Sequence, residues 1–404
     1  MSDGLEHEVV RVERPATGGG VGRLSDGRVV FVRDSLAGEL VSVSITERTS
    51  SFARAVVRQV LEASSQRTSP PCHYAGAGGC GGCDLQHAST AAQIAWKRDV
   101  VTEQLRRIGG FDWPVVVTSA TVPAQGSRTR LRCAVDAHGR LALRSARSHD
   151  LVAVNPCWLM SERAAEAFTT TWRNATEVEV RAIGDGPPFA VVRRVGGRAA
   201  RLEVCSLDGS RLDPSPVSRV EVRGTHYEVS PASFWQSHVE APEMLLDRVT
   251  RWAAVERGDR VVDLYSGVGL FAVSLAASVG PTGHVVAVES SPHAVRDARS
   301  NAQGHGALRV RESTVSPKLV ANLVRPGDVV IVDPPRTGLA RGVATAIAAQ
   351  EPRRILYVSC DAATFARDLK VFLSARFSLS HLEILDLFPM TEHVELVSLL
   401  DFAP

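Results

Sequence analysis

The chain has 404 residues, of which 44% are hydrophobic and 22% are charged, and its formal net charge is only +2. These values are ordinary for a globular protein of two or three domains, and they exclude a uniformly basic polypeptide, so any surface for nucleic acid must be local. No uninterrupted apolar run approaches the roughly 18 residues of a membrane-spanning helix, and residues 1–8 lack the basic and apolar regions of a signal peptide. We therefore expect a cytoplasmic protein without a membrane partner.

Residues 1–60 are predicted to form a small β-barrel. Short runs rich in β-branched residues alternate with glycine-containing turns. A five-stranded barrel of the oligonucleotide-binding kind would suit this spacing, although a small β-sandwich has the same pattern. The strand candidates are Val9–Val12, Arg28–Arg33, Leu40–Ile45 and Ala53–Val57.

Residues 61–228 form a second, β-rich region that holds most of the seven cysteines. In a reducing compartment, cysteines favour metal binding or catalysis over disulfides. Cys72 precedes the C-x2-C pair of Cys80 and Cys83, and Cys157 is a remote fourth candidate. Zinc takes four ligands in a tetrahedron, and an iron–sulfur cluster takes four thiolates, often three close and one remote. A redox-active pair, or two buried thiols, would leave the same spacing.

Two further patterns in this region concern packing and charge. Residues 90–108 have the apolar spacing of a helix, and we expect this helix to pack on the C-terminal domain. Arg128, Arg130 and Arg132 recur at a period of two, which places three guanidinium groups on one face of a strand. We predict that they contact nucleic-acid phosphates; a solvated strand face is the alternative.

Residues 229–404 alternate between β and α patterns, which predicts a doubly wound α/β domain. The run Gly267-Val-Gly-Leu-Phe-Ala272 fits a G-x-G-x-x-A turn between a strand and a helix. Glu289 ends the next strand, where an acid binds ribose hydroxyls. This pattern predicts an adenosine-containing cofactor. The buried strands are expected at Val261–Leu264, Val285–Val288, Val329–Val332 and Ile355–Val358.

Two more strand ends carry reactive groups. Ligands bind outside the carboxyl ends of parallel strands, so the thiol of Cys360, which follows a predicted strand, should face the site. Asp333-Pro-Pro-Arg336 follows another strand and is typical of methyltransferases that act on planar bases. Arg336 takes the place of an aromatic residue there, which argues against methylation of an exocyclic amine. A buried structural thiol is the alternative for Cys360.

Taken together, these motifs resemble those of the S-adenosylmethionine-dependent RNA uracil-5-methyltransferases, over nearly the whole chain. The resemblance implies a Rossmann-like class I methyltransferase domain over residues 229–404, an N-terminal TRAM barrel over 1–60 and a cluster-binding domain over 61–228. It also implies a [4Fe–4S] cluster on Cys72, Cys80, Cys83 and Cys157. The motifs that carry it are Ser233-Phe-Trp-Gln236, Asp263-Leu-Tyr-Ser-Gly-Val-Gly269, Asp333-Pro-Pro-Arg336, Val358-Ser-Cys360 and His393-Val-Glu395.

The resemblance further assigns roles to single residues. Cys360 would add as a thiolate to C6 of uracil, which makes C5 reactive towards the sulfonium methyl group. Glu395 would then remove the C5 proton. The target base must be flipped out, because it cannot be reached inside a helix. The residues expected to hold the cofactor are Gln236, Tyr265, Gly267, Gly269, Glu289 and Asp333.

The expected partner is RNA. A barrel joined to a cluster domain resembles the ribosomal-RNA enzymes of the family more than the compact transfer-RNA ones, so we expect methylation of 23S ribosomal RNA by a monomeric protein. Formation of 5-methyluridine in transfer RNA is the alternative. A nicotinamide-dependent oxidoreductase and a non-catalytic RNA-binding protein are rival functions, and both leave Cys360 and Glu395 unexplained.

Overall fold

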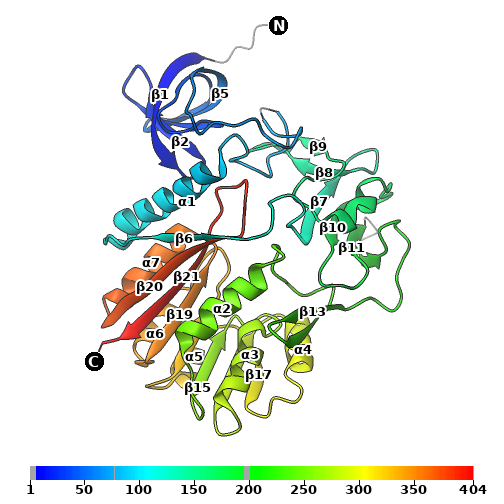
Figure 1. Ribbon diagram of the computed structural model, residues 1–404, viewed down its shortest axis with the longest axis vertical. Coiled ribbons are helices and arrows are strands. Elements are labelled where there is room, and N and C mark those ends of the chain that lie inside the picture. Colours follow the sequence, from blue (N-terminus) through cyan, green and yellow to red (C-terminus); the bar gives the residue numbers. More distant parts are fainter. Residues whose placement is uncertain (1–5, 77, 195–200, 404) are drawn as a thin grey trace. The chain divides into compact units, whose positions relative to one another are not determined.

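The computed structural model describes residues 6–76, 78–194 and 201–403. The chain divides into two compact units, and segments that are distant in the sequence contribute to each of them (Figure 1). The first unit contains Met1–Glu103, Ala142–Val154 and Phe388–His393. The second unit contains Gln104–Leu141, Asn155–Leu387 and Val394–Pro404.

The first unit begins with a closed barrel whose strand order is β1-β2-β3-β5-β4. Because the side chains of a strand alternate between its two faces, every second residue points inward, and Val10, Val12, Val30 and Val32 are at most 1% exposed. Closure pairs the two outer strands with each other, and the predicted N-terminal barrel is confirmed. The strands are β1 (His7–Ala16), β2 (Gly19–Arg23), β3 (Val29–Arg33), β4 (Leu40–Arg48) and β5 (Phe52–Glu62).

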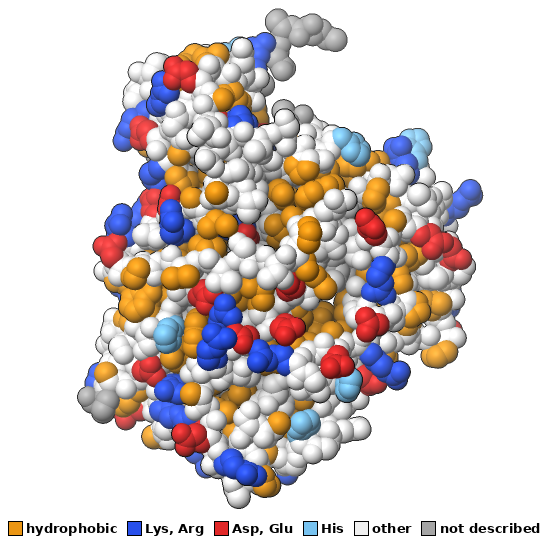
Figure 2. Space-filling view, in the orientation of Figure 1, with side chains coloured by type: hydrophobic (Ala, Val, Ile, Leu, Met, Phe, Trp, Pro, Cys, Tyr) orange, Lys and Arg blue, Asp and Glu red, His pale blue; other side chains and the backbone are white. Residues whose placement is uncertain are grey.

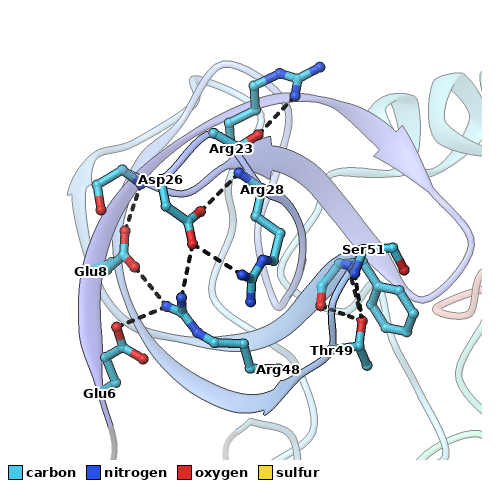
Figure 3. Close-up of polar contacts among 11 residues, drawn as sticks. Glu6, Glu8, Arg23, Asp26, Arg28, Arg48, Thr49 and Ser51 are labelled. Carbon is cyan, nitrogen blue, oxygen red and sulfur yellow. Dashed lines mark hydrogen bonds and ion pairs between the residues drawn. The ribbon is translucent and has the colours of Figure 1, made fainter.

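A surface network links strand β4 to the start of β1 and to the β2–β3 turn (Figure 3). The Arg48 guanidinium donates hydrogen bonds to one carboxylate oxygen each of Glu6, Glu8 and Asp26, at 2.8, 3.0 and 3.1 Å. Glu8 also accepts a hydrogen bond from the backbone N–H of Ser25, which lowers the pKa of Glu8. Ion pairs that stay in contact with water contribute little to stability, because solvent screens them.

A buried ion pair joins the barrel to the segment that follows it. Glu39 is 0% exposed, and its carboxylate accepts hydrogen bonds from Nε and Nη2 of Arg67 at 2.6 and 2.7 Å. The backbone N–H groups of Leu36 and Ser64 donate to the same carboxylate at 2.8 and 3.2 Å. Burial raises the pKa of Glu39, but the hydrogen bonds outweigh burial and hold that pKa below its usual value. Glu39 is therefore ionised at neutral pH.

A helix after the cysteine-rich segment binds the distant Phe388–His393 segment within the first unit. Lys97 is fully buried on this helix, and its ammonium group donates a hydrogen bond to the carbonyl of Phe388 at 2.8 Å. The side-chain oxygen of Gln93 accepts a hydrogen bond from the backbone N–H of Met390, also at 2.8 Å. The helical elements here are α1 (Thr90–Gln104) and the π-helical turn η1 (Leu105–Gly109) that continues it.

Short antiparallel strands occupy the middle of the sequence. Strands β12, β11, β10 and β7 pair in that order in the second unit, and β8 pairs with β9. Strands β13 and β14 form a separate hairpin. Their bounds are β7 (Arg130–Val135), β8 (Leu141–Arg144), β9 (Leu151–Ala153), β10 (Ala175–Arg181), β11 (Phe189–Arg194), β12 (Arg201–Cys205), β13 (Ser218–Val222) and β14 (Thr225–Val229), with the 3-10 helix η2 (Glu162–Phe168) between β9 and β10.

The main sheet of the second unit has the strand order β17-β16-β15-β18-β19-β21-β20-β6. Strands β15 to β19 are parallel, and β21 runs antiparallel to both β19 and β20. The predicted doubly wound α/β domain is confirmed, and its strand order reverses at β15, where such sheets bind ligands. The strands are β6 (Val116–Ser119), β15 (Arg260–Leu264), β16 (His284–Glu289), β17 (Leu308–Glu312), β18 (Val329–Val332), β19 (Arg354–Ser359), β20 (Phe377–Asp386) and β21 (Glu395–Phe402).

Helices cover both faces of this sheet (Figure 1). Leu356 and Val358 belong to the core that includes helices α2 and α3. The intervening Tyr357 points to the opposite face, because strand side chains alternate, and its ring contacts Phe365 and Phe372 of α7. The helices are α2 (Ala241–Ala253), α3 (Leu270–Val279), α4 (Pro292–Asn301), α5 (Pro317–Leu323), α6 (Val343–Ala348) and α7 (Ala362–Leu373).

The distribution of charged side chains on the surface is consistent with the small net charge of the chain. On the face shown in Figure 2, basic and acidic side chains are interspersed among apolar ones. Within the described ranges, no helix is both long and apolar enough to cross a membrane. Recognition of a charged partner therefore depends on local groups.

We predict that Arg67→Ala lowers the free energy of unfolding by about 3 kcal/mol, because Glu39 would stay buried without its cationic partner. Urea-induced unfolding followed by circular dichroism measures this difference. The native pKa of Glu39 lies below its unfolded value, so the stability that the pair contributes is present above an unfolded pKa of about 4.3 and is lost as the pH falls through the native pKa. Wild-type protein should therefore lose more stability than the variant on acidification.

The matched control is Arg48→Ala, which removes the same side chain from the exposed network of the same barrel. This variant should change the free energy of unfolding much less, because water already solvates its partners. Equal losses in the two variants would contradict a special contribution from the buried pair.

Candidate active site

The first loop of the candidate site follows β15, the strand at which the order of the parallel strands in the sheet reverses. Tyr265, Gly267 and Gly269 have φ angles of 65°, 56° and 94°, and Gly269 immediately precedes α3. Glycine adopts positive φ without a steric penalty, so the G-x-G spacing permits a tight turn from strand into helix. Tyr265 adopts the same region despite its side chain, and such local strain is concentrated at functional sites.

A buried carboxyl supports this turn. Asp263 is 0% exposed, and its Oδ2 accepts a hydrogen bond from the backbone N–H of Ala272 at 3.1 Å. Burial raises the pKa of Asp263 well above its usual value, and the charges of Asp333 and Glu289 raise it further. Within the part of the chain that the structure describes, Oδ1 of Asp263 and the hydroxyl of Ser266 have no hydrogen-bond partner. A polar cofactor bound beside the glycine turn would supply hydrogen-bond partners for these two buried oxygens.

Backbone groups hold the acid at the end of β16 in place. Oε2 of Glu289 accepts a hydrogen bond from the N–H of Gly267 at 3.0 Å. Its Oε1 accepts from the N–H groups of Ser290 and Ser291, each at 2.7 Å. These donors orient the carboxylate against the glycine turn and leave lone pairs for other donors. The arrangement fits an acid that accepts hydrogen bonds from ribose hydroxyls.

Helix α4 supports the glycine turn from a distant part of the sequence. The side-chain amide of Asn301 donates hydrogen bonds to the carbonyls of Val268 and Glu228, both at 3.0 Å, and accepts one from the N–H of Glu228 at 2.7 Å. Asp297 accepts a hydrogen bond from the N–H of Ser230 at 2.8 Å. Sequence reasoning missed Asn301, because it lies in no motif and its partners are set only by folding.

Helix α7 holds the loop that begins at Asp333 in the same way. The carboxylate of Asp368 accepts hydrogen bonds from the N–H of Leu339 at 2.8 Å and from the hydroxyl of Tyr357 at 2.7 Å. Arg367 donates to the carbonyl of Leu339 at 3.2 Å. Asp368 was likewise absent from the sequence-based prediction, since helical spacing alone predicts only that it packs or faces water.

Strand pairing brings Cys360 and Glu395 together. Cys360 follows β19, and Glu395 is the first residue of β21. Ser359 pairs with Leu396 in the antiparallel register. Cys360 is one residue after Ser359 and Glu395 is one residue before Leu396, so the two lie beside each other. Cys360 is half-buried, whereas Glu395 is only 5% exposed. The thiol and the carboxyl therefore lie at the carboxyl ends of the parallel strands, where Asp333 also follows β18.

Burial favours the protonated forms of these groups. Burial raises the pKa of the Cys360 thiol to about 11, and the charge of Glu395 adds to this effect. Burial raises the pKa of Asp333 to about 7. Burial and the charge of Asp333 raise the pKa of Glu395 well above its usual value. Arg336 acts in the opposite direction, because its positive charge favours the ionised forms of Cys360 and Glu395.

Two other predicted cofactor residues are tied to neighbouring loops. Gln236 lies between β14 and α2, and its backbone carbonyl accepts a hydrogen bond from the hydroxyl of Thr129 at 3.2 Å. Burial raises the pKa of Tyr265, whereas a hydrogen bond with the backbone of Ala340 partly offsets this increase. The roles of Gln236 and Tyr265 towards a cofactor stay predictions.

The three arginines of the predicted phosphate-binding stripe differ in their surroundings. Arg130 donates to both carboxylate oxygens of Glu179 at 2.8 and 2.9 Å, and Arg132 donates to one of them at 3.1 Å. Burial raises the pKa of Glu179, but the hydrogen bond from Arg130 and nearby positive charge lower it to about 2. Arg128 forms no ion pair with the residues described. The local positive charge is therefore smaller than three arginines suggest.

The four cysteines expected to hold a cluster are divided between the two compact units. Among the described residues, no group of three or more His, Cys, Asp or Glu side chains is placed to hold a metal ion. Cys72, Cys80 and Cys83 belong to the first unit, and Cys157 belongs to the second. Thiolates are the donors that an iron–sulfur cluster requires, and the cluster on these four cysteines stays a prediction.

Comparison with known proteins gives consistent results across the chain. Family models match for "tRNA (Uracil-5-)-methyltransferase" over residues 326–402, for "TRM5/TYW2 methyltransferase domain" over residues 220–317 and for "TRAM domain" over residues 8–57. An uncharacterized RNA methyltransferase of Streptomyces coelicolor is 36% identical, and the match covers 98% of this chain and 93% of that protein. The 23S rRNA (uracil(1939)-C(5))-methyltransferase RlmD of Pseudomonas entomophila is 32% identical, over 96% and 92%.

A solved structure shares the fold. The crystal structure of Pyrococcus abyssi tRNA (uracil-54, C5)-methyltransferase in complex with S-adenosyl-L-homocysteine superposes with a TM-score of 0.71. The match covers 97% of this chain and 100% of that chain at 24% sequence identity. The fold of this chain is thus one already seen by crystallography.

We predict that Glu289→Gln weakens S-adenosylmethionine binding about tenfold to a hundredfold, because its NH2 group would oppose a backbone N–H donor and remove one charged hydrogen-bond acceptor. Isothermal titration calorimetry measures this affinity directly. The matched control is Glu312→Gln, since Glu312 is exposed and pairs in register with Glu289 on β17. Unchanged affinity in Glu289→Gln would show that Glu289 does not contact the cofactor.

Proposed function

Because this chain belongs to the family of S-adenosylmethionine-dependent RNA uracil-5-methyltransferases, we propose that it methylates C5 of a uridine in 23S ribosomal RNA through a covalent adduct with Cys360. The observation that carries this mechanism is the β19–β21 register, which places Cys360 beside Glu395. C5 methylation needs both a nucleophile and a separate base, since C5 of uracil is a poor nucleophile until a group adds at C6.

S-adenosylmethionine supplies an electrophilic sulfonium methyl group when it is bound. We propose that Glu289 accepts hydrogen bonds from its ribose hydroxyls and that the Gly267–Gly269 turn contacts its polar groups. The hydrogen bonds that orient Glu289 and the open oxygen of Asp263 support this assignment. Tyr265 completes the proposed cofactor site.

Cys360 acts first in the proposed reaction. Burial raises its pKa to about 11, so little thiolate is present at neutral pH in the ligand-free site. As RNA binds, the thiol proton passes to solvent water, and the positive charge of Arg336 favours the resulting thiolate. The sulfur then forms a bond to C6, and the π electrons of the C5–C6 bond move onto C5 and the O4 carbonyl. C5 can then accept the methyl group: a C5–methyl bond would form as the methyl–sulfur bond breaks, and S-adenosylhomocysteine would leave as a neutral thioether.

Glu395 acts second. After methyl transfer, C5 carries both a hydrogen and a methyl group. The Glu395 carboxylate removes the hydrogen as a proton, the C–H electrons restore the C5–C6 double bond, and the thiolate leaves C6. Burial and the charge of Asp333 raise the pKa of Glu395, which makes its ionised form a stronger base than an exposed glutamate.

We assign Asp333 and Gln236 to hydrogen bonds with the uracil edge or the cofactor. Uracil presents an N–H donor between two carbonyl acceptors. Because burial raises the pKa of Asp333 to about 7, this carboxyl can accept a hydrogen bond when ionised or donate one when protonated. At neutral pH, Asp333 can therefore pair with either the N–H donor or a carbonyl acceptor of uracil.

Ribosomal RNA is the substrate that we favour. Its support is the name of the Pseudomonas entomophila relative, which matches nearly the whole chain. Transfer RNA is the alternative, because the C-terminal family model and the Pyrococcus abyssi structure are named for transfer-RNA enzymes. We propose that Arg128, Arg130 and Arg132 contact phosphates, and the hydrogen bonds of Arg130 and Arg132 to Glu179 would orient their guanidinium groups.

We also keep the [4Fe–4S] cluster on Cys72, Cys80, Cys83 and Cys157 as a proposal. Its support is the presence of four thiols in the chain and the family resemblance. Metal sites often form only when the metal binds, because ligand binding and folding are coupled. No catalytic step proposed here depends on the cluster.

The remaining proposals concern organisation and location. We propose that residues 1–60 form an RNA-binding barrel, residues 61–228 a cluster-binding region and residues 229–404 the methyltransferase domain. We propose that the protein acts as a monomer in the cytoplasm. What supports this location is the set of RNA methyltransferases that it resembles, since ribosomal and transfer RNA are intracellular substrates.

We predict that Cys360→Ala abolishes methylation and forms no covalent adduct. Glu395→Gln should still add to the base and transfer the methyl group, but a methylated adduct should accumulate because the C5 proton stays in place. Denaturing gels with labelled RNA separate the slowly migrating adduct from free RNA. Wild-type enzyme should give the same band with RNA that carries fluorine at C5, because fluorine cannot leave as a cation.

The control for loss of a thiol is Cys205→Ala, which should form the adduct normally because Cys205 is buried on β12. Substantial methylation by Cys360→Ala would end this mechanism, and normal turnover by Glu395→Gln would assign the base to another residue. The same assay with 23S ribosomal-RNA and transfer-RNA fragments identifies the substrate. An adduct with transfer RNA alone would favour the alternative function.

We predict that protein purified without oxygen contains iron and sulfide at about four of each per chain. Cys80→Ser should lose both, and the control Cys133→Ser should keep them. Elemental analysis and electronic absorption measure this content independently of activity. Stoichiometric zinc without sulfide would contradict the cluster and favour a zinc site.

A further inference from the structure

A cavity of about 210 Å³ lies within the first unit. Its walls come from the β1–β2 turn, the end of β3, the cysteine-rich segment, α1, the β8–β9 loop and the Phe388–His393 segment. The polar side chains that line it include Arg33, Asp84, Trp96, Arg147 and Glu392. None of these side chains takes part in the methyl-transfer chemistry proposed above.

One polar group in this wall lacks a partner. Trp96 is only 5% exposed, and its indole Nε1–H finds no acceptor among the residues that the structure describes. An indole N–H can donate but not accept a hydrogen bond, and buried donors in native proteins are nearly always paired. A molecule in the cavity that carries an acceptor atom would supply the missing partner.

Two carboxyl groups share the same wall. Oε2 of Glu392 accepts a hydrogen bond from the N–H of Gly18 at 2.6 Å, and Asp84 accepts one from the N–H of Glu392. In the described part of the chain, neither carboxyl forms an ion pair. Burial and the charge of Asp84 raise the pKa of Glu392, whereas the hydrogen bond from Gly18 and the charge of Arg147 oppose this shift. A ligand with adjacent N–H groups would supply further donors to these carboxyl groups.

Two guanidinium groups complete the wall. Arg33 donates long hydrogen bonds to Asp34 and to the carbonyl of Ala146, both at 3.4 Å. Burial lowers the pKa of Arg147, and repulsion from Arg54 lowers it further. Guanidinium planes stack on nucleobases and donate to their acceptor atoms. The cavity therefore offers donors and acceptors together, which suits an uncharged polar ring better than a simple ion.

We propose that this cavity binds an unpaired guanine base of the RNA substrate, an inference that rests on the proposed function. Guanine presents adjacent N1–H and N2–H donors to a carboxylate, and its O6 and N7 atoms are acceptors for Trp96 and an arginine. Uracil has a single N–H donor on its pairing edge, and adenine and cytosine have one amino group each, so they satisfy the carboxylates less completely. The volume suits one base, since pockets for larger ligands begin at about 300 Å³.

The test uses full-length protein and substrate RNA in which single guanosines are replaced by inosine, which keeps O6 and lacks only the N2 amino group. Fluorescence anisotropy measures the dissociation constants. At one position, inosine is expected to weaken binding to wild-type protein about tenfold. Glu392→Gln should remove this difference, because its carboxylate is the proposed partner of N2. Trp96→Phe should weaken binding of both RNAs equally, because both keep O6.

The matched control is Asp99→Asn on the exposed side of α1, which should retain the full difference between guanosine and inosine. Absence of any inosine-sensitive position, or an undiminished difference in Glu392→Gln, would overturn the guanine site. Binding of guanosine monophosphate by calorimetry, lost in Trp96→Phe and combined with RNA binding indifferent to inosine, would assign the cavity to a free nucleotide and also overturn the proposal.

Adduct formation with 5-fluorouridine RNA, measured in the same samples, separates this proposal from the proposed function. Failure of wild-type protein to form the adduct with any RNA would count against the methyl-transfer mechanism. Normal adduct formation without an inosine effect would remove only the guanine site.

Discussion

The pairing of β21 with β19 is the contact on which the active site depends. β21 runs antiparallel between β19 and β20, so its first residues meet the last residues of β19. This arrangement delivers Glu395 to the edge where Cys360 emerges from the sheet. A slip of one residue would turn the Glu395 side chain to the opposite face, because strand side chains alternate. β21 forms hydrogen bonds with both β19 and β20, and these bonds prevent such a slip.

Desolvation then determines the chemical state of the site. Asp333 and Glu395 lie near Cys360, Asp263 lies near Asp333, and Arg336 is a cation that acts on the thiol and on Glu395. Burial favours the protonated form of each acid and of the thiol. Ionised groups that the reaction needs must therefore be stabilised by partners that arrive with the substrate and the cofactor. The same effect disfavours the thiolate that the proposed reaction requires.

Polar side chains outside the motifs position the reactive loops. Asn301 joins the glycine turn to the β14 hairpin, and Asp368 joins the loop after Asp333 to the strand that leads to Cys360. In the first unit, the Phe388–His393 segment hydrogen-bonds to α1 and contributes Glu392 to the cavity that contains Trp96. Rigid hydrogen-bonded support of this kind is what keeps reactive groups within reach of one another.

The sequence by itself determined the N-terminal barrel, the alternating α/β domain and the residues at the strand ends, because side-chain period, glycine turns and reactive residue types are local properties. It also identified Cys360, Asp333 and Glu395 as candidates. Only the tertiary structure decided that β21 pairs with β19, that Glu179 neutralises Arg130, and that Asn301 and Asp368 brace the loops. Those contacts join segments far apart in the chain, so neither spacing nor composition contains them, and burial changes pKa values only once the surrounding walls are assembled.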